Sequence, residues 1–389
     1  MTEVRFGVVG IGNIGSMHVR NLFEKKIRGA RLSAVCDCDE EKLRRTVETY
    51  GVPGFADWRE LLRSGAVDAV LIAVPHALHC EIAIAAMQAG LHVLTEKPAG
   101  IRVSEVRRMN AEADRHPVVF GIMFNQRTNM LFAKARELVR SGALGKRKRL
   151  SWIITNWYRT QSYYDSGSWR ATWRGEGGGV LLNQAPHNLD IAQWIFGMPK
   201  TVRAVCREGL YHNITVEDYA AIYGEYDDGA SLQFITTTGE FPGTNRLEIV
   251  GDRGKLVLEE GKLKCWLLTE SEEAVRFSSD VGMPRIPYTY EEFTPDAPER
   301  AHCGILENFT EAILEGTPLL ADGREGIHQL TLTNAAYLSA WTDTVITLPM
   351  DEALFDQYHN EKGNSEQEKP KSAAKGGDEE HLPRWQVNW

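Results

Sequence analysis

The sequence predicts an α/β protein with two domains, in which a doubly wound parallel sheet is followed by an α+β domain. Three observations support this prediction. Short apolar runs alternate with helical patterns over the first third of the chain, and a glycine-rich turn joins the first strand to the first helix. After about Phe124, strands separated by short turn signals replace that alternation. A length of 389 residues, with 43% hydrophobic and 25% charged residues, suits a globular chain of two or three domains.

The first domain is expected to cover residues 1–124. Apolar runs predict strands at 4–9, 31–36, 69–74, 91–94 and 117–122, and helical patterns fill the intervals at 14–26, 40–50, 79–89 and 104–114. The last of these helices is expected to begin with Ser104 as its cap. The run 69–74 is apolar throughout, as expected for a strand that is buried on both faces of a parallel sheet.

The second domain is expected to cover residues 125–359. The pattern predicts a helix at 129–140, a strand at about 149–158, a loop rich in Tyr, Trp and Gly, and a helix near 185–196. Later strands are joined by turn signals at 227–229, 251–254 and 260–261, which is typical of an antiparallel meander. We therefore expect a large, mostly antiparallel, open sheet with helices on one face.

Residues 360–389 are expected to form a polar tail of linker composition, which ends in Trp385 and Trp389. Two interpretations of its tip stay open: it is disordered, or its tryptophans dock elsewhere, for example on a partner subunit.

The composition argues against several classes of partner. A net charge of −9 and a pI near 5.7 disfavour nucleic acids and anionic membranes. We predict no signal peptide, because Met1–Arg5 runs directly into an apolar strand, and no stretch approaches the ~20 apolar residues of a membrane span. The six cysteines include no CxxC pair, so reduced thiols are expected in a cytoplasmic protein without a metal site.

A dinucleotide-binding turn is predicted at Gly10–Gly15, which fits the pattern GxGxxG. The motif follows a strand and opens a helix, and that context makes it specific. Gly10 permits the tight turn, Gly12 lets the backbone approach a pyrophosphate, and Gly15 allows close packing of helix and strand. The helix that starts near Asn13 and Ile14 then offers free N–H groups and a partial positive charge to the phosphates.

Asp37 is the expected ligand of the ribose hydroxyls, because it ends the second strand. Asp39, Glu40 and Glu41 add negative charge nearby, and no Arg or Lys occurs before Lys42. Since this environment would repel a 2′-phosphate, the sequence favours NAD over NADP.

Glu96-Lys97-Pro98 follows the strand at 91–94. Ligands of open α/β sheets bind beyond the carboxyl ends of the strands, so Lys97 is expected to face the cofactor crevice. Pro98 restricts the backbone of Lys97 and so directs its side chain. The lysine ammonium can stabilise a developing alkoxide, or it can transfer a proton if burial lowers its pKa.

A third group follows the glycine run 177–179. Asn183, His187 and Asp190 are spaced i, i+4 and i+7, so they share one helical face if the segment is helical. Pro186 suits the first turn of such a helix. His187 is our candidate general base, with a purely structural histidine as the alternative.

The loop at 163–174 is expected to bind substrate. Tyr163 and Trp169 provide aromatic faces that stack on the C–H surfaces of sugars, and Arg170 can bind hydroxyls or carboxylates. A packed loop without a binding role is the alternative. His302, at the start of a later helix, is interpreted as structural.

Taken together, these motifs and the segment Ala73–His79 resemble the Gfo/Idh/MocA oxidoreductases over about residues 3–350. The resemblance implies a Rossmann domain followed by an α+β domain whose open sheet commonly mediates dimers or tetramers. It also implies that Lys97 and His187 flank the reacting carbon. By the same analogy Val74, Pro75 and His79 line the cofactor crevice with Glu96, and Asn125 lies near the nicotinamide.

One position departs from the family pattern. Family dehydrogenases usually carry an aspartate four residues before the histidine, where this chain has Asn183, which can form hydrogen bonds but cannot take up a proton. His187 is then expected to act alone, with Asp190 as the orienting carboxylate and Lys97 as electrostatic support.

The resemblance implies hydride transfer between NAD(H) and a sugar, cyclic polyol or glycoside. Two alternatives stay open: a lyase or glycosidase that oxidises a sugar transiently and eliminates a substituent, and a non-enzymatic regulator that senses NAD.

Overall fold

The computed structural model describes residues 2–366, and they divide into two compact units. The first contains residues up to 128 and returns for 300–331, and the second contains 129–299 and the described residues from 332 onward. The sequence analysis placed 300–331 in the second domain. These residues belong to the first unit because helix α11 (Ala301–Glu315) packs on its sheet, where the rings of Phe309 and Phe6 lie 6.1 Å apart.

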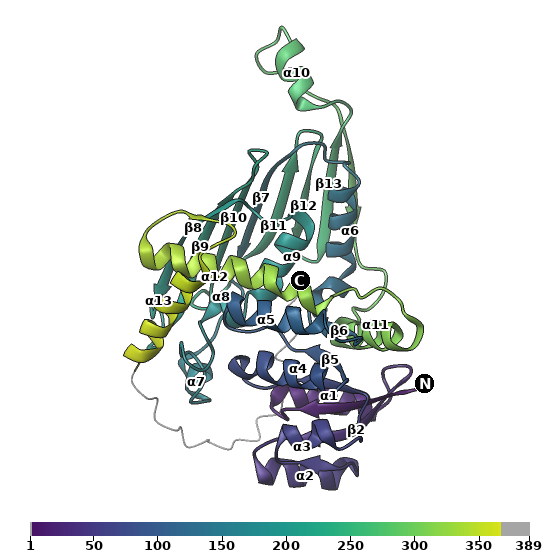
Figure 1. The fold of residues 1–389 in the computed structure, drawn as a ribbon. Coiled ribbons are helices and arrows are strands. Elements are labelled where there is room, and N and C mark those ends of the chain that lie inside the picture. Colours follow the sequence, from purple (N-terminus) through teal and green to yellow (C-terminus); the bar gives the residue numbers. More distant parts are fainter. Residues whose placement is uncertain (1, 367–389) are drawn as a thin grey trace. The chain divides into compact units, whose positions relative to one another are not determined.

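The first unit is built on a six-stranded parallel sheet in the order β3-β2-β1-β4-β5-β6 (Figure 1). Its strands are β1 (Val4–Val9), β2 (Ala30–Cys36), β3 (Gly54–Phe55), β4 (Ala69–Ile72), β5 (His92–Thr95) and β6 (Phe120–Ile122). Its helices are α1 (Asn13–Phe23), α2 (Glu40–Tyr50), α3 (Trp58–Arg63), α4 (His79–Gln88), α5 (Val103–Ala113) and α11, with short 3₁₀ turns η1 (His76–Leu78), η2 (Asn125–Thr128) and η3 (Gly323–Glu325). The predicted doubly wound sheet is confirmed.

Some element boundaries differ from the prediction. The cap of α5 is Arg102 rather than Ser104, which lies inside the helix. Helix α1 ends at Phe23 because Lys25 adopts a left-handed backbone with φ 54°. Strand β3 and helix α3 were not predicted, since two and six residues are too few to show a clear period.

The second unit contains a nine-stranded sheet in the order β14-β13-β12-β11-β7-β10-β9-β8-β15. The strands are β7 (Arg147–Ile154), β8 (Thr201–Glu208), β9 (Glu217–Glu225), β10 (Ser231–Thr237), β11 (Asn245–Gly251), β12 (Gly254–Glu259), β13 (Lys262–Leu268), β14 (Tyr288–Phe293) and β15 (Ile346–Thr347). The pairing of β7 with β10 is parallel and the other neighbouring strands of this sheet pair antiparallel, so the predicted mostly antiparallel sheet is confirmed.

The helices of this unit are α6 (Met130–Arg140), α7 (Gln161–Asp165), α8 (Val180–Asn183), α9 (Pro186–Phe196), α10 (Glu272–Ser278) and α13 (Glu352–Ser365). Helix α12 (Gly326–Thr342) begins in the first unit and ends in the second. Helix α13 extends past residue 360, where the sequence analysis began its polar tail. Asp351 caps this helix by accepting the N–H of Leu354. The tail was predicted from its composition alone, which does not reveal such a cap. The terminal tryptophans Trp385 and Trp389 lie outside the described residues.

The two faces of the nine-stranded sheet differ in character. On one face Trp152 of β7 is fully buried, and its ring lies 5.6 Å from Phe132 of α6 and 6.2 Å from Phe234 of β10. On the opposite face Ile153, Val205 and Tyr223 are 41%, 48% and 44% exposed. Helices α6 and α9 lie along the buried face (Figure 1). Within residues 2–366, no helix has the length and apolar character needed to cross a membrane.

Candidate active site

The predicted dinucleotide turn has the backbone geometry that its glycines permit. Gly10 has φ +90°, and a Cβ there would lie 2.4 Å from the carbonyl oxygen of Ala73. A Cβ on Gly15 would lie 1.9 Å from the carbonyl oxygen of Gly10. At Gly12, by contrast, no atom lies within 4 Å of an added Cβ, so open space adjoins the turn where a pyrophosphate would approach.

Helix α1 opens directly from this turn. Its cap, Gly12, has no side chain to accept the first N–H groups, so those of Asn13 and Ile14 are left to other acceptors. An eleven-residue helix also carries a partial positive charge at this end. Both properties suit a bound diphosphate.

The carboxylate of Asp37 is held beside the turn. Its Oδ2 accepts the N–H of Ile11 at 2.7 Å, and its Oδ1 accepts the N–H of Asp39 at 2.9 Å. The Nζ of Lys42 lies 4.0 Å from Asp37 Oδ2 and 3.7 Å from Asp39 Oδ2. Lys42, the nearest cationic residue that follows Asp37 in the sequence, is therefore paired with two carboxylates. The two backbone N–H groups fix the Asp37 carboxylate in an orientation that suits ribose hydroxyls.

The loop after β4 carries the other predicted cofactor residues of this edge. Val74 and Pro75 are partly exposed, whereas His79 is fully buried. The ring nitrogens of His79 lie 2.8 Å from the carbonyl oxygen of Pro98 and 2.9 Å from that of Val74, and burial lowers its pKa. His79 therefore supports the two loops, and the exposed surface of this loop comes from its neighbours.

Lys97 follows β5, the neighbour of β4 and β6, and its side chain is partly exposed. Its N–H donates to Oε2 of the buried Glu96 at 3.2 Å. Oε1 of Glu96 lies 2.8 Å from Nε2 of His18, and the His18 ring lies 5.7 Å from the ring of His302. The backbone of Lys97 is thus attached to a buried row of ionisable groups.

These neighbours determine the charge behind Lys97. Burial would raise the pKa of Glu96, but the hydrogen bond and charge of His18 outweigh it and lower that pKa to about 2. Burial lowers the pKa of His302 to about 4, so this ring is neutral at pH 7. Sequence reasoning missed His18, although its position three residues after Gly15 on the same helix was a usable signal.

Asn125 lies in η2, after β6. Its Oδ1 is buried and has no hydrogen-bond partner within the described residues. A buried carbonyl oxygen without a donor is costly, so this atom suits a ligand that brings an N–H or O–H group. The turn, Asp37 and Asn125 together fit a bound dinucleotide.

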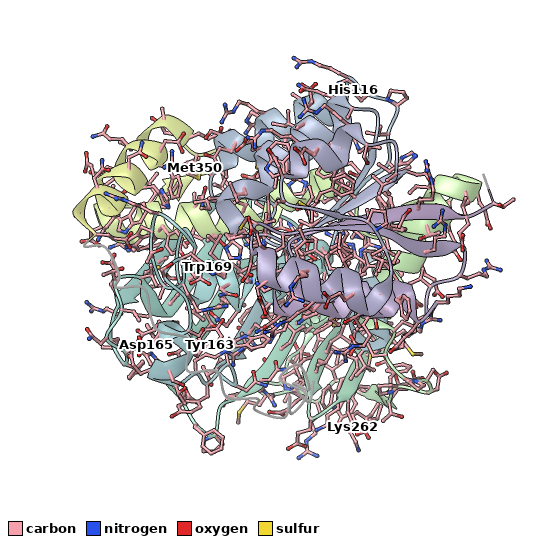
Figure 2. The ribbon with its side chains drawn as sticks, turned by 90° about the horizontal axis from the view of Figure 1, so that it is seen from below. His116, Tyr163, Asp165, Trp169, Lys262 and Met350 are labelled. Atoms are coloured by element: carbon pink, nitrogen blue, oxygen red, sulfur yellow. The ribbon has the colours of Figure 1, made fainter. Side chains whose placement is uncertain are left out.

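In the second unit the predicted loop residues surround one phenol oxygen. The Oη of Tyr163 accepts hydrogen bonds from Arg170 Nη1 at 2.6 Å, Gln184 Nε2 at 3.1 Å and Asn183 Nδ2 at 3.2 Å. The Cζ of Arg170 lies 4.4 Å from the Tyr163 ring and 4.7 Å from that of Trp169. Tyr163 and Trp169 accordingly lie near one another in Figure 2. The structure therefore brings these predicted substrate residues together.

Glu176 completes this cluster and was not predicted. It is 1% exposed, its Oε2 accepts the N–H of Ala171 at 2.6 Å, and its Oε1 accepts a hydrogen bond from Asn183 Nδ2. Because a carboxylate only accepts hydrogen bonds, the NH₂ group of the Asn183 side chain faces Glu176. The side-chain carbonyl oxygen of Asn183 therefore points away from Glu176. A lone acidic residue beside a glycine run was the signal that sequence reasoning overlooked.

The sequence analysis placed Asn183, His187 and Asp190 on one helical face if the segment was helical, but Asn183 and His187 belong to two different helices. Helix α8 ends at Asn183, and α9 starts at Pro186, which has no N–H to continue the hydrogen-bond ladder. His187 is partly exposed in the first turn of α9. Asp190 is buried, and its Oδ1 accepts a hydrogen bond from Gln193 at 2.9 Å.

Glu217 of β9 supports the glycine run. Its carboxylate accepts the N–H groups of Gly179 at 2.8 Å and Leu181 at 2.9 Å and the hydroxyl of Tyr337 at 2.7 Å. A Cβ on Gly179 would lie 1.9 Å from the Glu217 carbonyl oxygen, and one on Gly178 2.2 Å from the Tyr337 hydroxyl. The glycines are therefore needed for close packing beneath α8, which carries Asn183.

The buried Glu217 predicts a pH-dependent stability. Burial raises its pKa from 4.5 to about 8, although three donors favour the charged form. The folded state thus binds the proton more tightly, so the stability contribution is complete below pH 4.5 and is lost as pH rises through 8. We expect the unfolding temperature to fall between about pH 6 and 9 by at least about 2 °C more in the parent than in Glu217→Gln, as measured by calorimetry. Equal falls in both proteins would contradict this assignment.

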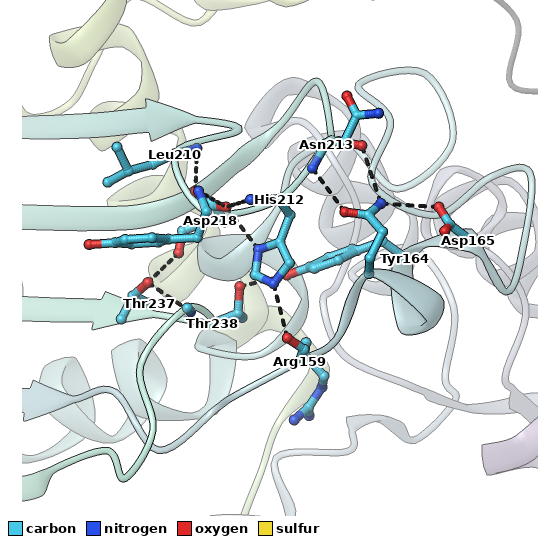
Figure 3. A network of polar contacts seen from close by, with 12 residues as sticks. Arg159, Tyr164, Asp165, Leu210, His212, Asn213, Asp218, Thr237 and Thr238 are labelled. Carbon is cyan, nitrogen blue, oxygen red and sulfur yellow. Dashed lines mark hydrogen bonds and ion pairs between the residues drawn. The ribbon is translucent and has the colours of Figure 1, made fainter.

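A second polar network anchors the segment before Tyr163 (Figure 3). Asp218 accepts the N–H groups of Leu210, Tyr211 and His212, and its Oδ2 lies 2.9 Å from His212 Nδ1. His212 Nε2 lies 2.9 Å from the carbonyl oxygen of Arg159. The connection between β8 and β9 therefore holds the segment at Arg159 that leads into α7, which carries Tyr163.

Two family models match the chain. One, described as the NAD-binding Rossmann fold of an oxidoreductase family, matches residues 4–124, and the other, its C-terminal alpha/beta domain, matches residues 136–348. The myo-inositol 2-dehydrogenase of Thermotoga maritima is 28% identical over 86% of this chain and 95% of its own length. The scyllo-inositol 2-dehydrogenase (NAD(+)) of Bacillus subtilis is 25% identical over 82% and 89%.

Solved structures show the same likeness. The WlbA dehydrogenase from Bordetella pertussis, determined in complex with NADH and UDP-GlcNAcA, superposes with a TM-score of 0.75 at 28% identity. The match covers 90% of this chain and 100% of that one.

Proposed function

Because the chain belongs to the Gfo/Idh/MocA oxidoreductase family and carries its NAD-binding domain, we propose that it is a dehydrogenase acting on a carbon of a sugar, cyclic polyol or glycoside. The inositol dehydrogenases and the UDP-GlcNAcA complex among its relatives support this substrate class. The observation that carries the proposal is the position of Lys97, at the carboxyl edge of the same sheet that carries the Gly10–Gly15 turn.

The protein's contribution is position and charge. NAD(H), when bound, supplies the hydride acceptor or donor. In the oxidative direction the Lys97 ammonium stabilises negative charge on the substrate oxygen, and His187 takes up the hydroxyl proton. Asn183, with its amide group held by Glu176, turns its carbonyl oxygen to accept a substrate hydroxyl.

The first experiment is an absorbance assay for NADH with NAD and four probes: myo-inositol, scyllo-inositol, levoglucosan and UDP-GlcNAcA. Product analysis is run on the same samples. NADH formation with one of them supports the proposal and identifies the substrate. Products without NADH would instead support transient oxidation and elimination, for which the neutral Asn183 is the supporting observation. Absence of both would argue against the proposed substrate class.

Asp37→Ala is expected to reduce the preference for NAD over NADP. Removing a carboxylate acceptor for the ribose hydroxyls should weaken NAD binding by about tenfold, and removing its charge should lessen the repulsion of a 2′-phosphate. Fluorescence titrations with NADH and NADPH check this, with Glu48→Ala on the same unit as the control. Unchanged affinity for both cofactors would show that Asp37 does not contact the ribose.

We also propose that copies of this chain associate through the open face of the nine-stranded sheet. Val205 of β8, Tyr223 of β9 and Ile153 of β7 are exposed on this face, and Arg149 and Glu248 share it. We further propose a cytoplasmic location, on the sequence observation that the six cysteines include no CxxC pair.

A further inference from the structure

The end of helix α13 lies against the loop that carries the substrate residues. Glu366 directly follows the helix, and its Oε1 accepts the N–H of Trp173 at 2.5 Å and the hydroxyl of Thr215 at 2.8 Å. Its Oε2 accepts the N–H of Arg174 at 3.2 Å. One carboxylate thus collects three donors, and such charge-assisted bonds are stronger than neutral ones.

Two further hydrogen bonds join the same segments. Arg174 Nε donates to the carbonyl oxygen of Gly363 at 2.5 Å, and His359 Nε2 lies 3.2 Å from the carbonyl oxygen of Gly177. Hydrogen bonds from α13 and Glu366 therefore hold the loop at several points between 173 and 177.

Aromatic packing stabilises the same contact. Trp173 is 2% exposed, and its ring meets those of Tyr337, Trp341 and His359 edge-on, with centroids 5.2, 5.3 and 5.9 Å away. Helix α13, in yellow in Figure 1, packs beside the end of α12, where Phe355 stacks on Trp341. The buried Trp173 ring thus adds apolar packing to the hydrogen bonds that Glu366 accepts from the backbone of Trp173 and Arg174.

The residues held in this way lie between two groups of the substrate cluster. Arg170 and Glu176 flank Trp173 and Arg174 in sequence, and they contact Tyr163 and Asn183. Ala171 has φ 52°, a left-handed conformation that a non-glycine residue keeps only when surrounding contacts impose it. A shift at Trp173 would therefore disturb both Arg170 and Glu176.

We propose that α13 and Glu366 form a clasp that holds loop 166–176 in its substrate-binding conformation, with Glu366 as a positioning residue. The clasp lies beyond residue 348, where the match to the family model ends. The inference rests on the proposed function, because it assigns substrate binding to the Tyr163–Asn183 cluster. Glu366 contacts the loop through the backbone N–H groups of Trp173 and Arg174, and its third donor is the Thr215 hydroxyl.

The test compares Glu366→Gln with Glu361→Gln in the full chain. Glu361 lies on the exposed side of α13, and its Oε1 accepts a hydrogen bond from Gln357 on the same helix, so it is a matched control. In Glu366→Gln, we expect amide hydrogen exchange of peptides covering 168–177 to accelerate about tenfold, since charge-assisted bonds to Trp173 and Arg174 are weakened. Exchange elsewhere and in the control should match the parent.

Kinetics provide the second measurement, with whichever of the four probes the parent oxidises. KM for that substrate should rise about tenfold in Glu366→Gln, while kcat and the Kd for NADH stay within about twofold. Adding Thr215→Val should increase KM by less than its own single effect, because both changes remove one shared contact.

Two results would overturn the clasp. Unchanged exchange over 168–177 would show that Glu366 does not hold the loop. A lower kcat, a higher KM, weaker NADH binding and faster exchange throughout the chain, all to a similar degree, would show general destabilisation. If the parent oxidises none of the probes, the proposed substrate class fails, whereas the exchange experiment still decides whether the clasp exists.

Discussion

Lys97→Met is expected to lower kcat/KM by about 10²–10⁴-fold and to leave the Kd for NADH within about threefold. Methionine keeps the length and apolar stem of the lysine but has no ammonium to stabilise charge on the substrate oxygen. The backbone of residue 97 stays attached, because its N–H still donates to Glu96. The nucleotide turn at Gly10–Gly15 and Asp37 are unchanged, so cofactor binding should persist.

Initial rates of NADH formation over a range of substrate concentrations give kcat/KM, and NADH fluorescence measures binding. Lys26→Met is the matched control, because Lys26 lies on the same unit and its Nζ pairs with the exposed Glu24. A near-parental rate in Lys97→Met would remove Lys97 from the catalytic residues. A parallel loss of NADH binding would instead assign it to the cofactor site.

His187→Ala should lower kcat by about 10²–10⁴-fold, because the proton of the substrate hydroxyl then has no positioned acceptor. The ring belongs to the first turn of α9, where truncation leaves the helix start at Pro186 intact. Removing the ring also leaves a space that a free imidazole can occupy. Added imidazole should therefore restore part of the rate.

The control for His187→Ala is His328→Ala, since His328 is exposed on α12. Steady-state NADH formation with and without imidazole measures both variants. Loss of activity without imidazole rescue, together with a lower unfolding temperature, would indicate that His187 is structural. That outcome would support the alternative left open from its sequence context.

The sequence was sufficient to predict those features that are formed by a single short segment. The turn at Gly10–Gly15 consists of a strand, three glycines and a helix, and each of these can be recognised from consecutive residues. The same holds for Lys97 after β5 and for the capped helix α6, whose cap Asn129 accepts the N–H groups of Leu131 and Phe132. The family resemblance rested on the turn at Gly10–Gly15, on Ala73–His79, on Glu96-Lys97-Pro98 and on the glycine run that leads to His187, and the two family models confirm it.

Interactions between distant segments could not be predicted in this way. His18 and Glu96 are 78 residues apart and meet only because α1 and β5 pack in one unit. The break between Asn183 and Pro186 was left open, because the polar spacing i, i+4, i+7 is the same whether or not the helix is continuous.

The sequence by itself determined the fold class, the NAD-binding turn and the positions of Lys97 and His187, since these depend on neighbouring residues and on strand and helix periods. Only the tertiary structure decided that Glu176 orients the amide of Asn183, that Glu217 supports the glycine run, and that Glu366 joins α13 to Trp173. Glu176 and Glu217 are buried and Glu366 is partly exposed, and each of these acidic side chains bonds donors from segments that only the packed chain brings beside it. No pattern of adjacent residues specifies which donors those will be.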